Sequence, residues 1–355
     1  MILRRGEIRM ALTAGLGNAF ASLSGLPFGY YVPLAVLAVG MGSYGGSLAL
    51  GRQRILGSVL GAALLVVGYE GLAAVPMPLA LALTLAALRL LGGALGLQVG
   101  YKVGGIIVVM GWLVHGGQLA GWIGLRLGWT CFGVMLALLS LRLFWPNRSL
   151  VLAFADTEAL LAELQRLYGD LADRLDPATA AVTAGSPPVG VERYRALRAR
   201  LLALRRQRPS LQEELGHNAG RHPLYRLIEG FDRAASRLVN ASGALVRRQP
   251  PLGDPSLAAR LNRAEAELLR CLVERMGLWR RLLKAAPGAL PRPPAEVLRL
   301  PESWTALEQA LHDPAMDGAS LERLERLAAR LMLCRQAAQA IRDGEASWRL
   351  LRLHP

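Results

Sequence analysis

Acidic side chains are almost absent from the first 146 residues of this 355-residue chain, where only Glu7 and Glu70 occur. Lysine is also rare, with Lys102 and Lys284 alone, and the three cysteines stand too far apart for a metal site. The five histidines are scattered without ligand spacing, and no Gly-Lys-Ser/Thr loop is present to cradle a phosphate. These absences exclude an ATP-driven pump powered by this chain itself, and we expect no metal and no cofactor.

Long apolar runs fill the same part of the chain and predict transmembrane helices, because a bilayer core of about 30 Å needs roughly 20 apolar residues. Backbone groups in lipid must also find partners within their own segment, which favours helices. Six spans are predicted, at residues 10–26, 30–50, 55–75, 77–97, 103–114 and 119–144.

The basic residues predict the orientation of these spans. Arg52 and Arg54 fall between the second and third predicted spans, Lys102 falls between the fourth and fifth, and the alternate connections have no Lys or Arg. Because basic loops remain on the cytoplasmic side of a membrane, we expect both termini in the cytoplasm. The expected location is the bacterial inner membrane. The membrane domain is then 1–148.

Residues 149–355 predict a cytoplasmic all-helical domain, since apolar residues recur there at helical spacing between Arg and Glu residues. Residues 176–190 are typical of a flexible linker, and Asp254-Pro255 predicts the start of a long helix that ends near Ala285. The Arg-rich face at 193–208 is interpreted as a solvated face paired with acids, with contact to anionic headgroups as the alternative. The net charge of +15 is shared between both halves, which argues against a nucleic-acid partner. The fold class predicted is thus an all-α membrane protein.

Small residues four apart predict tight packing between the helices. A single six-helix unit with glycine-rich faces is expected to form a two-fold dimer, with loss of Gly57 or Gly61 lowering the dimer content. The candidate packing pairs are Gly57 and Gly61, Gly92 and Gly96, and Gly124 and Gly128.

Charges inside the predicted spans are the candidates for function. Arg89 lies about midway along the fourth span and Arg126 about two turns into the sixth. Such a residue usually faces a bundle interior or a water-filled path, although Arg126 could instead extend outward to the interface. With almost no acids to balance them, Arg89, Arg126 and Lys102 are predicted to line an anion pathway.

Two stretches resemble the fusaric-acid-resistance (FUSC-type) or aromatic acid exporter superfamily: PFGYYVP at 27–33, and RQRILGSVLG at 52–61, which contains Arg52, Arg54, Gly57 and Gly61. The exit FWP at 144–146 is also similar to that family. The resemblance implies six spans, a cytosolic helical domain and export of organic, often aromatic, carboxylates. The membrane half is also similar to plant aluminium-activated malate transporters, which implies a dimeric anion channel.

Two hypotheses follow. The first is a homodimeric transporter or channel in the lipid bilayer that carries a small organic anion, probed by anion flux with and without Arg89. The second is a membrane-anchored scaffold or sensor that recruits partners through its large cytoplasmic domain. An enzyme is not expected, because no titratable groups cluster.

Overall fold

The structure is a computed structural model that describes residues 5–40, 42–144, 148–176, 191–247, 255–286, 289–310 and 321–353. All regular elements in these ranges are helices, in agreement with the predicted all-α class. The chain forms two compact units, one of residues 1–149 with 209–217 and one of residues 150–208 with 218–355.

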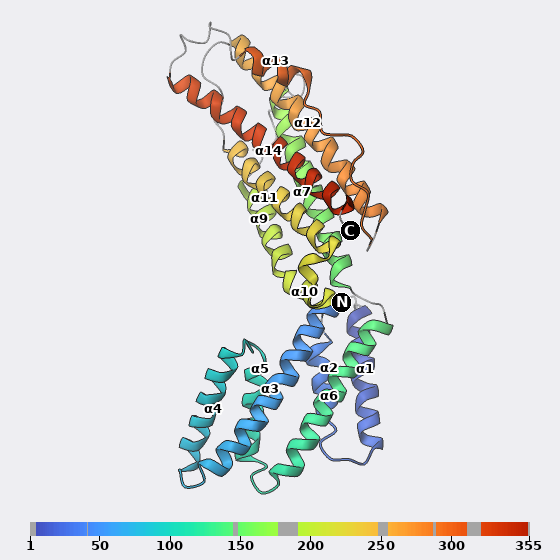
Figure 1. Cartoon of the computed structure of the whole chain (residues 1–355), viewed down its shortest axis with the longest axis vertical. Coiled ribbons are helices and arrows are strands. Elements are labelled where there is room, and N and C mark those ends of the chain that lie inside the picture. The colour runs from blue at the N-terminus through green and yellow to red at the C-terminus, as the bar shows by residue number, and fades with distance from the viewer. Residues whose placement is uncertain are drawn as a thin grey trace. The chain divides into compact units, whose positions relative to one another are not determined.

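The first unit holds six apolar helices followed later in the chain by a short one. In this unit α3 packs against α5 and α6, and α2 packs against α6 and α1 (Figure 1). The helices are α1 (Arg5–Leu23), α2 (Tyr31–Val39), α3 (Tyr44–Gly71), α4 (Met77–Ala94), α5 (Gly100–Leu113), α6 (Leu119–Leu143) and α10 (Arg208–Leu215).

Three of the described helices, α3, α4 and α6, are long and apolar enough to cross a membrane, and α5 is apolar but shorter. At 1.5 Å per residue, the 28 residues of α3 extend about 42 Å, whereas the nine residues of α2 extend about 14 Å. The count of six complete spans therefore stays a prediction.

The break between α2 and α3 corrects the predicted second span, which was placed at 30–50. Gly42 has a φ of +133°, a backbone conformation that glycine adopts readily. Ser43 then caps α3, because its side chain accepts a hydrogen bond from the backbone N–H of Gly46. Residues 44–50 consequently belong to the next helix.

The predicted connections at Arg52, Arg54 and Lys102 were also wrong. Arg52 and Arg54 lie inside α3, and Lys102 lies in the first turn of α5. Arginine is a good helix former, and its long apolar stem lets it remain in a helix near a membrane surface. Nothing between Leu50 and Ile55 stops the helix.

The short helix α10 packs against the start of α3 within the first unit. A Cβ on Gly45 would lie 1.8 Å from the backbone oxygen of Ser210, so glycine is required at this approach. Arg52 forms a salt bridge of 3.2 Å with Glu213, and the Ser149 backbone N–H donates to Glu214. Residues 209–217 thus extend the membrane unit beyond its expected boundary at residue 148.

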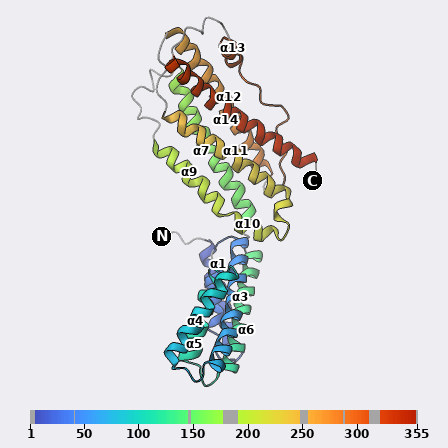
Figure 2. The same cartoon turned by 60° about the vertical axis from the view of Figure 1, so that its left-hand side comes forward.

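The second unit is a bundle of long amphipathic helices, in which α11 lies beside α9 and α14, and α12 beside α13 and α14 (Figure 2). The linker at 177–190 and the cap position Asp254 lie outside the described residues. The predicted long helix is present as α12, with its end at Ala285. The helices are α7 (Ser149–Leu175), α9 (Val191–Arg206), α11 (Pro223–Val246), α12 (Pro255–Ala285), α13 (Glu302–Ala310) and α14 (Leu321–Leu353), with a 3-10 turn at Ala219–Arg221.

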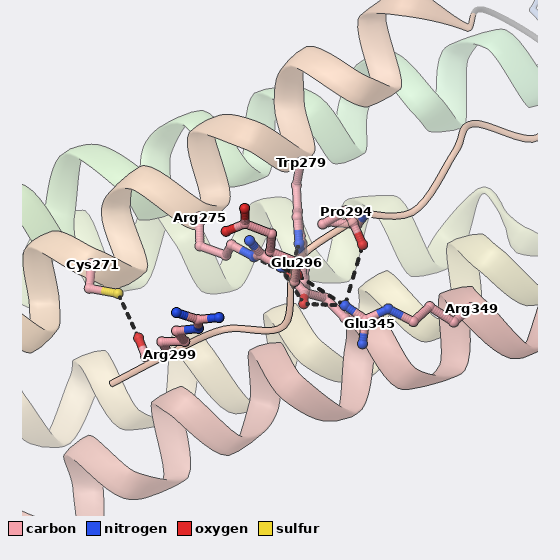
Figure 3. Close-up of polar contacts among 8 residues, drawn as sticks. All are labelled: Cys271, Arg275, Trp279, Pro294, Glu296, Arg299, Glu345 and Arg349. Atoms are coloured by element: carbon pink, nitrogen blue, oxygen red, sulfur yellow. Dashed lines mark hydrogen bonds and ion pairs between the residues drawn. The ribbon is translucent and has the colours of Figure 1, made fainter. Parts of the chain in front are cut away.

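The core of the second unit contains a buried carboxylate. Glu345 is 1% exposed and accepts hydrogen bonds from Trp279 Nε1 at 2.9 Å and Arg275 Nη2 at 2.7 Å (Figure 3). The hydrogen bonds that Arg275 donates to Glu345 raise the pKa of Arg275, against the opposing effect of burial. Arg275 and Arg349 also donate to the backbone oxygen of Glu296, which holds an extended segment across α12 and α14.

The Arg-rich face of α9 is paired with acids, as interpreted from the sequence. Arg200 forms a salt bridge of 3.1 Å with Glu163, and Arg193 pairs with Asp170 on α7. Arg205, at the end of α9, binds Asp232 at 2.9 Å.

Candidate anion site in the membrane unit

One face of α6 positions the candidate site. Trp122, Arg126 and Thr130 recur every four residues, one turn apart, and all three are buried. Apart from Trp129, the remaining buried positions of this helix are small or aliphatic, and α6 packs on α2 and α3. The helix therefore carries a cation into the interior of an apolar bundle.

Among the described residues of the membrane unit, Arg126 is the most deeply buried cation, with 3% of its surface exposed. Its guanidinium carbon lies 3.5 Å from the centroid of the Tyr31 ring on α2, a cation–π contact. Its Nε and Nη1 atoms are buried without a hydrogen-bond partner. A buried donor without an acceptor costs free energy, so these N–H groups would bind an acceptor that enters the bundle.

A second cation lies close to the first. Arg54 on α3 is partly buried, its Nε has no hydrogen-bond partner, and its positive charge repels that of Arg126. Two cations in a largely apolar region raise the local electrostatic potential. Such an arrangement attracts an anion, and the planar guanidinium groups match the geometry of a carboxylate.

An aromatic pocket of about 710 Å³ opens one turn before Arg126. Trp122 lines it, together with Phe28, Tyr69 and Glu70, and residues 116–121 complete the lining. His115 lies over Trp122, with ring centroids 4.4 Å apart. The apolar rings suit a planar aromatic body, and Glu70 is the one charged residue among the described residues of the lining.

The loop between α1 and α2 holds Phe28 at this pocket. Trp129 Nε1 donates a hydrogen bond of 2.9 Å to the backbone oxygen of Pro27. Phe28 itself has a φ of +67°, which is unusual for a bulky residue. Strained positions of this kind concentrate at ligand sites, and this one directs an aromatic ring toward His115, at 5.5 Å between centroids.

Residues 14–140, which include every residue of this site, match the family model described as fusaric acid resistance protein-like. The match lies within the membrane unit of this chain, which is thus similar to the fusaric acid resistance protein-like family. This similarity supports a membrane transport role. No curated protein matches the chain.

Within the fusaric acid resistance-like unit, the other pathway candidates lie away from Arg126. Arg89 is exposed on α4, beyond the middle of that helix, and its guanidinium carbon lies 4.5 Å from the centroid of the Tyr101 ring. Lys102 is exposed at the start of α5. Arg89 lies outside the buried face of α4, which Ala80, Thr84 and Leu88 form, and its place in an anion pathway stays a prediction.

The predicted packing glycines have different environments. Gly57 and Gly61 lie against Gly100 and Gly104 of α5, and Gly92 lies against Tyr101, all within one chain. Gly96 instead has a φ of +68° at the end of α4, a typical helix-terminating position. Gly124 and Gly128 are exposed on α6, and no atom lies within 4 Å of a Cβ placed on either.

The sequence alone predicted no role for Trp122, included Tyr31 only in the family-like stretch at 27–33, and predicted that Arg54 lies between two spans. The spacing of four residues between Trp122 and Arg126 would have indicated that they share a face. No sequence signal indicates that Tyr31 reaches the guanidinium of Arg126, because that contact depends on how α2 packs against α6. Among the described residues no group of His, Cys, Asp and Glu could hold a metal ion.

Proposed function

We propose that this protein transports organic carboxylate anions, preferentially aromatic ones, out of a bacterial cell, and that it acts as a homodimer. The observation that carries the proposal is the unpartnered guanidinium of Arg126, buried one turn below the aromatic pocket. The pocket would accept the ring of the substrate, and Arg126 with Arg54 would attract its carboxylate. Similarity to the fusaric acid resistance protein-like family supports efflux as the direction of transport.

Arg126 thereby replaces Arg89 as the first candidate for the substrate cation. An exposed arginine is stabilised without a bound anion. A buried arginine without an acidic partner is unfavourable, and binding of an anionic substrate would relieve that cost. Both termini would lie in the cytoplasm, so the pocket at the α5–α6 connection would face the outside.

Homodimer formation is supported by the exposed glycines of α6. Gly124 and Gly128 leave their helix backbone open over one full turn, and small residues at such positions allow close approach of another helix in a membrane. The occupant that fits a two-fold assembly is α6 of a second copy.

The proposal is tested by flux of a labelled aromatic carboxylate, such as benzoate, into or out of vesicles reconstituted with the full chain. Removal of one member of a buried charged contact typically costs about 2–5 kcal/mol, so Arg126→Gln should lower flux by at least tenfold. Arg126→Lys should retain part of it, because a point charge replaces the planar fork.

Arg142→Gln is the matched control, since Arg142 is exposed in the last turn of α6. Its flux should equal that of the unaltered chain. An Arg126→Gln protein that is folded and transports at the unaltered rate contradicts the proposal. Absence of anion flux in the unaltered chain would favour the scaffold hypothesis.

A further inference from the structure

Arg89, Tyr101 and Lys102 form a basic surface where α4 meets α5. Arg89 lies five residues before Ala94, about 8 Å along the helix from its end, and Lys102 is the third residue of α5. The two helices lie side by side (Figures 1 and 2). This places both cations close to the same end of a membrane-embedded pair.

The Tyr101 ring holds the guanidinium of Arg89 on this surface. The ring centroid and the guanidinium carbon are 4.5 Å apart, while Arg89 remains exposed. None of the salt bridges among the described residues includes Arg89 or Lys102. The structure thus shows no acidic partner for either cation among these residues. A cation on the lipid-facing side of a membrane helix is favoured where it reaches the interface or an anion, and at the end of a membrane helix the available anions are lipid headgroups.

The surroundings favour an amphiphilic partner over a free ion. Gly93 lies one turn after Arg89, and no atom is within 4 Å of a Cβ placed there, so the surface is open beside the guanidinium. Leu90, the next residue of α4, is exposed. A headgroup phosphate would meet the two cations while its acyl chains cover the exposed apolar surface of α4.

We infer that Arg89, Tyr101 and Lys102 bind the phosphate of an anionic phospholipid headgroup. The guanidinium fork receives two phosphate oxygens, and the ammonium of Lys102 adds a third contact. Tyr101 holds the guanidinium in one orientation, so the site offers a defined geometry to a phosphate in addition to its positive charge. This inference is independent of the transport proposal, because it concerns the outer face of α4 and not the interior of the bundle.

The test is retention of phosphatidylglycerol by the purified full chain during exchange into phosphatidylcholine nanodiscs, followed by lipid mass spectrometry. Each cation near an anionic lipid contributes about a fivefold gain in affinity. Arg89→Gln and Lys102→Gln should therefore each retain phosphatidylglycerol about fivefold more weakly. Excess inorganic phosphate should not displace the lipid.

Tyr101→Phe keeps the ring and should bind as the unaltered chain does, whereas Tyr101→Leu keeps both charges and should bind more weakly. Arg142→Gln removes an exposed arginine of α6 and should have no effect. The inference is overturned by unchanged retention in Arg89→Gln, by an equal loss in Arg142→Gln, by equal binding of Tyr101→Phe and Tyr101→Leu, or by displacement with phosphate.

Discussion

Replacing Gly57 of α3 by alanine places a methyl group where α3 and α5 touch through their backbones. The new Cβ would lie 2.0 Å from the backbone oxygen of Gly100. A carbon and a carbonyl oxygen ordinarily approach no closer than about 3.3 Å, so the helices must separate by more than about 1 Å. Overpacking of this kind costs about 1–3 kcal/mol, and we expect the upper part of that range because no flexible side chain can yield.

Thermal unfolding of the purified chain measures this effect, with Gly15→Ala on α1 as the control. No atom lies within 4 Å of a Cβ on Gly15, and substitutions without such contacts change stability by less than about 0.5 kcal/mol. Gly57→Ala should therefore lower the Tm by several degrees and Gly15→Ala should leave it nearly unchanged. Equal Tm values for the two variants would refute the packing of α3 on α5.

Three further predictions concern other parts of the chain. Gly45→Ala should lower the Tm, because its Cβ would lie 1.8 Å from the backbone oxygen of Ser210. The Cβ of Gly46→Ala would meet the two hydroxyls of Ser43 and Ser210, each at 3.3 Å, and should be tolerated better. Equal Tm values for the two variants would contradict the docking of α10. Gly124→Leu, in cross-linking or mass measurements in mild detergent, should reduce the dimer fraction, and an unchanged fraction would remove α6 as the interface. Burial raises the pKa of Glu158, but hydrogen bonds and charges from Arg280 and Lys284 outweigh it and hold the pKa below its ordinary value. Glu158 therefore stabilises the fold above the ordinary carboxyl pKa of about 4.3 and loses that contribution as the pH falls below it, so the Tm difference between the unaltered chain and Glu158→Gln should shrink from pH 7 to pH 3.

Hydropathy and helical spacing were enough to predict an all-α chain with an apolar first part, because apolar runs and amphipathic stripes are local properties. The end of α12 at Ala285 was predicted for the same reason. The start of α3 was missed because Gly42 and Ser43 stand within an apolar run, where their effect on the backbone is easily overlooked.

The candidate site was predicted only in part. Arg126 was predicted as a candidate from its charge and its position in a span. Whether it is buried depends on which face of α6 packs against α2, and the sequence alone does not indicate that face. Arg89 differs from Leu88 by one residue, or about 100° around the helix, and that rotation takes it from the buried face to the outer one. The contact with Tyr31 is a tertiary feature that no local pattern contains.

The central claim is that Arg126 recognises the carboxylate of the substrate. Equilibrium binding of radiolabelled benzoate to the detergent-purified full chain tests it most directly, since binding does not depend on the direction or the driving force of transport. Arg126→Gln should weaken binding by tenfold or more, Arg126→Lys by less, and Arg89→Gln not at all. Equal affinities in the Arg126→Gln protein and the unaltered chain would contradict the account.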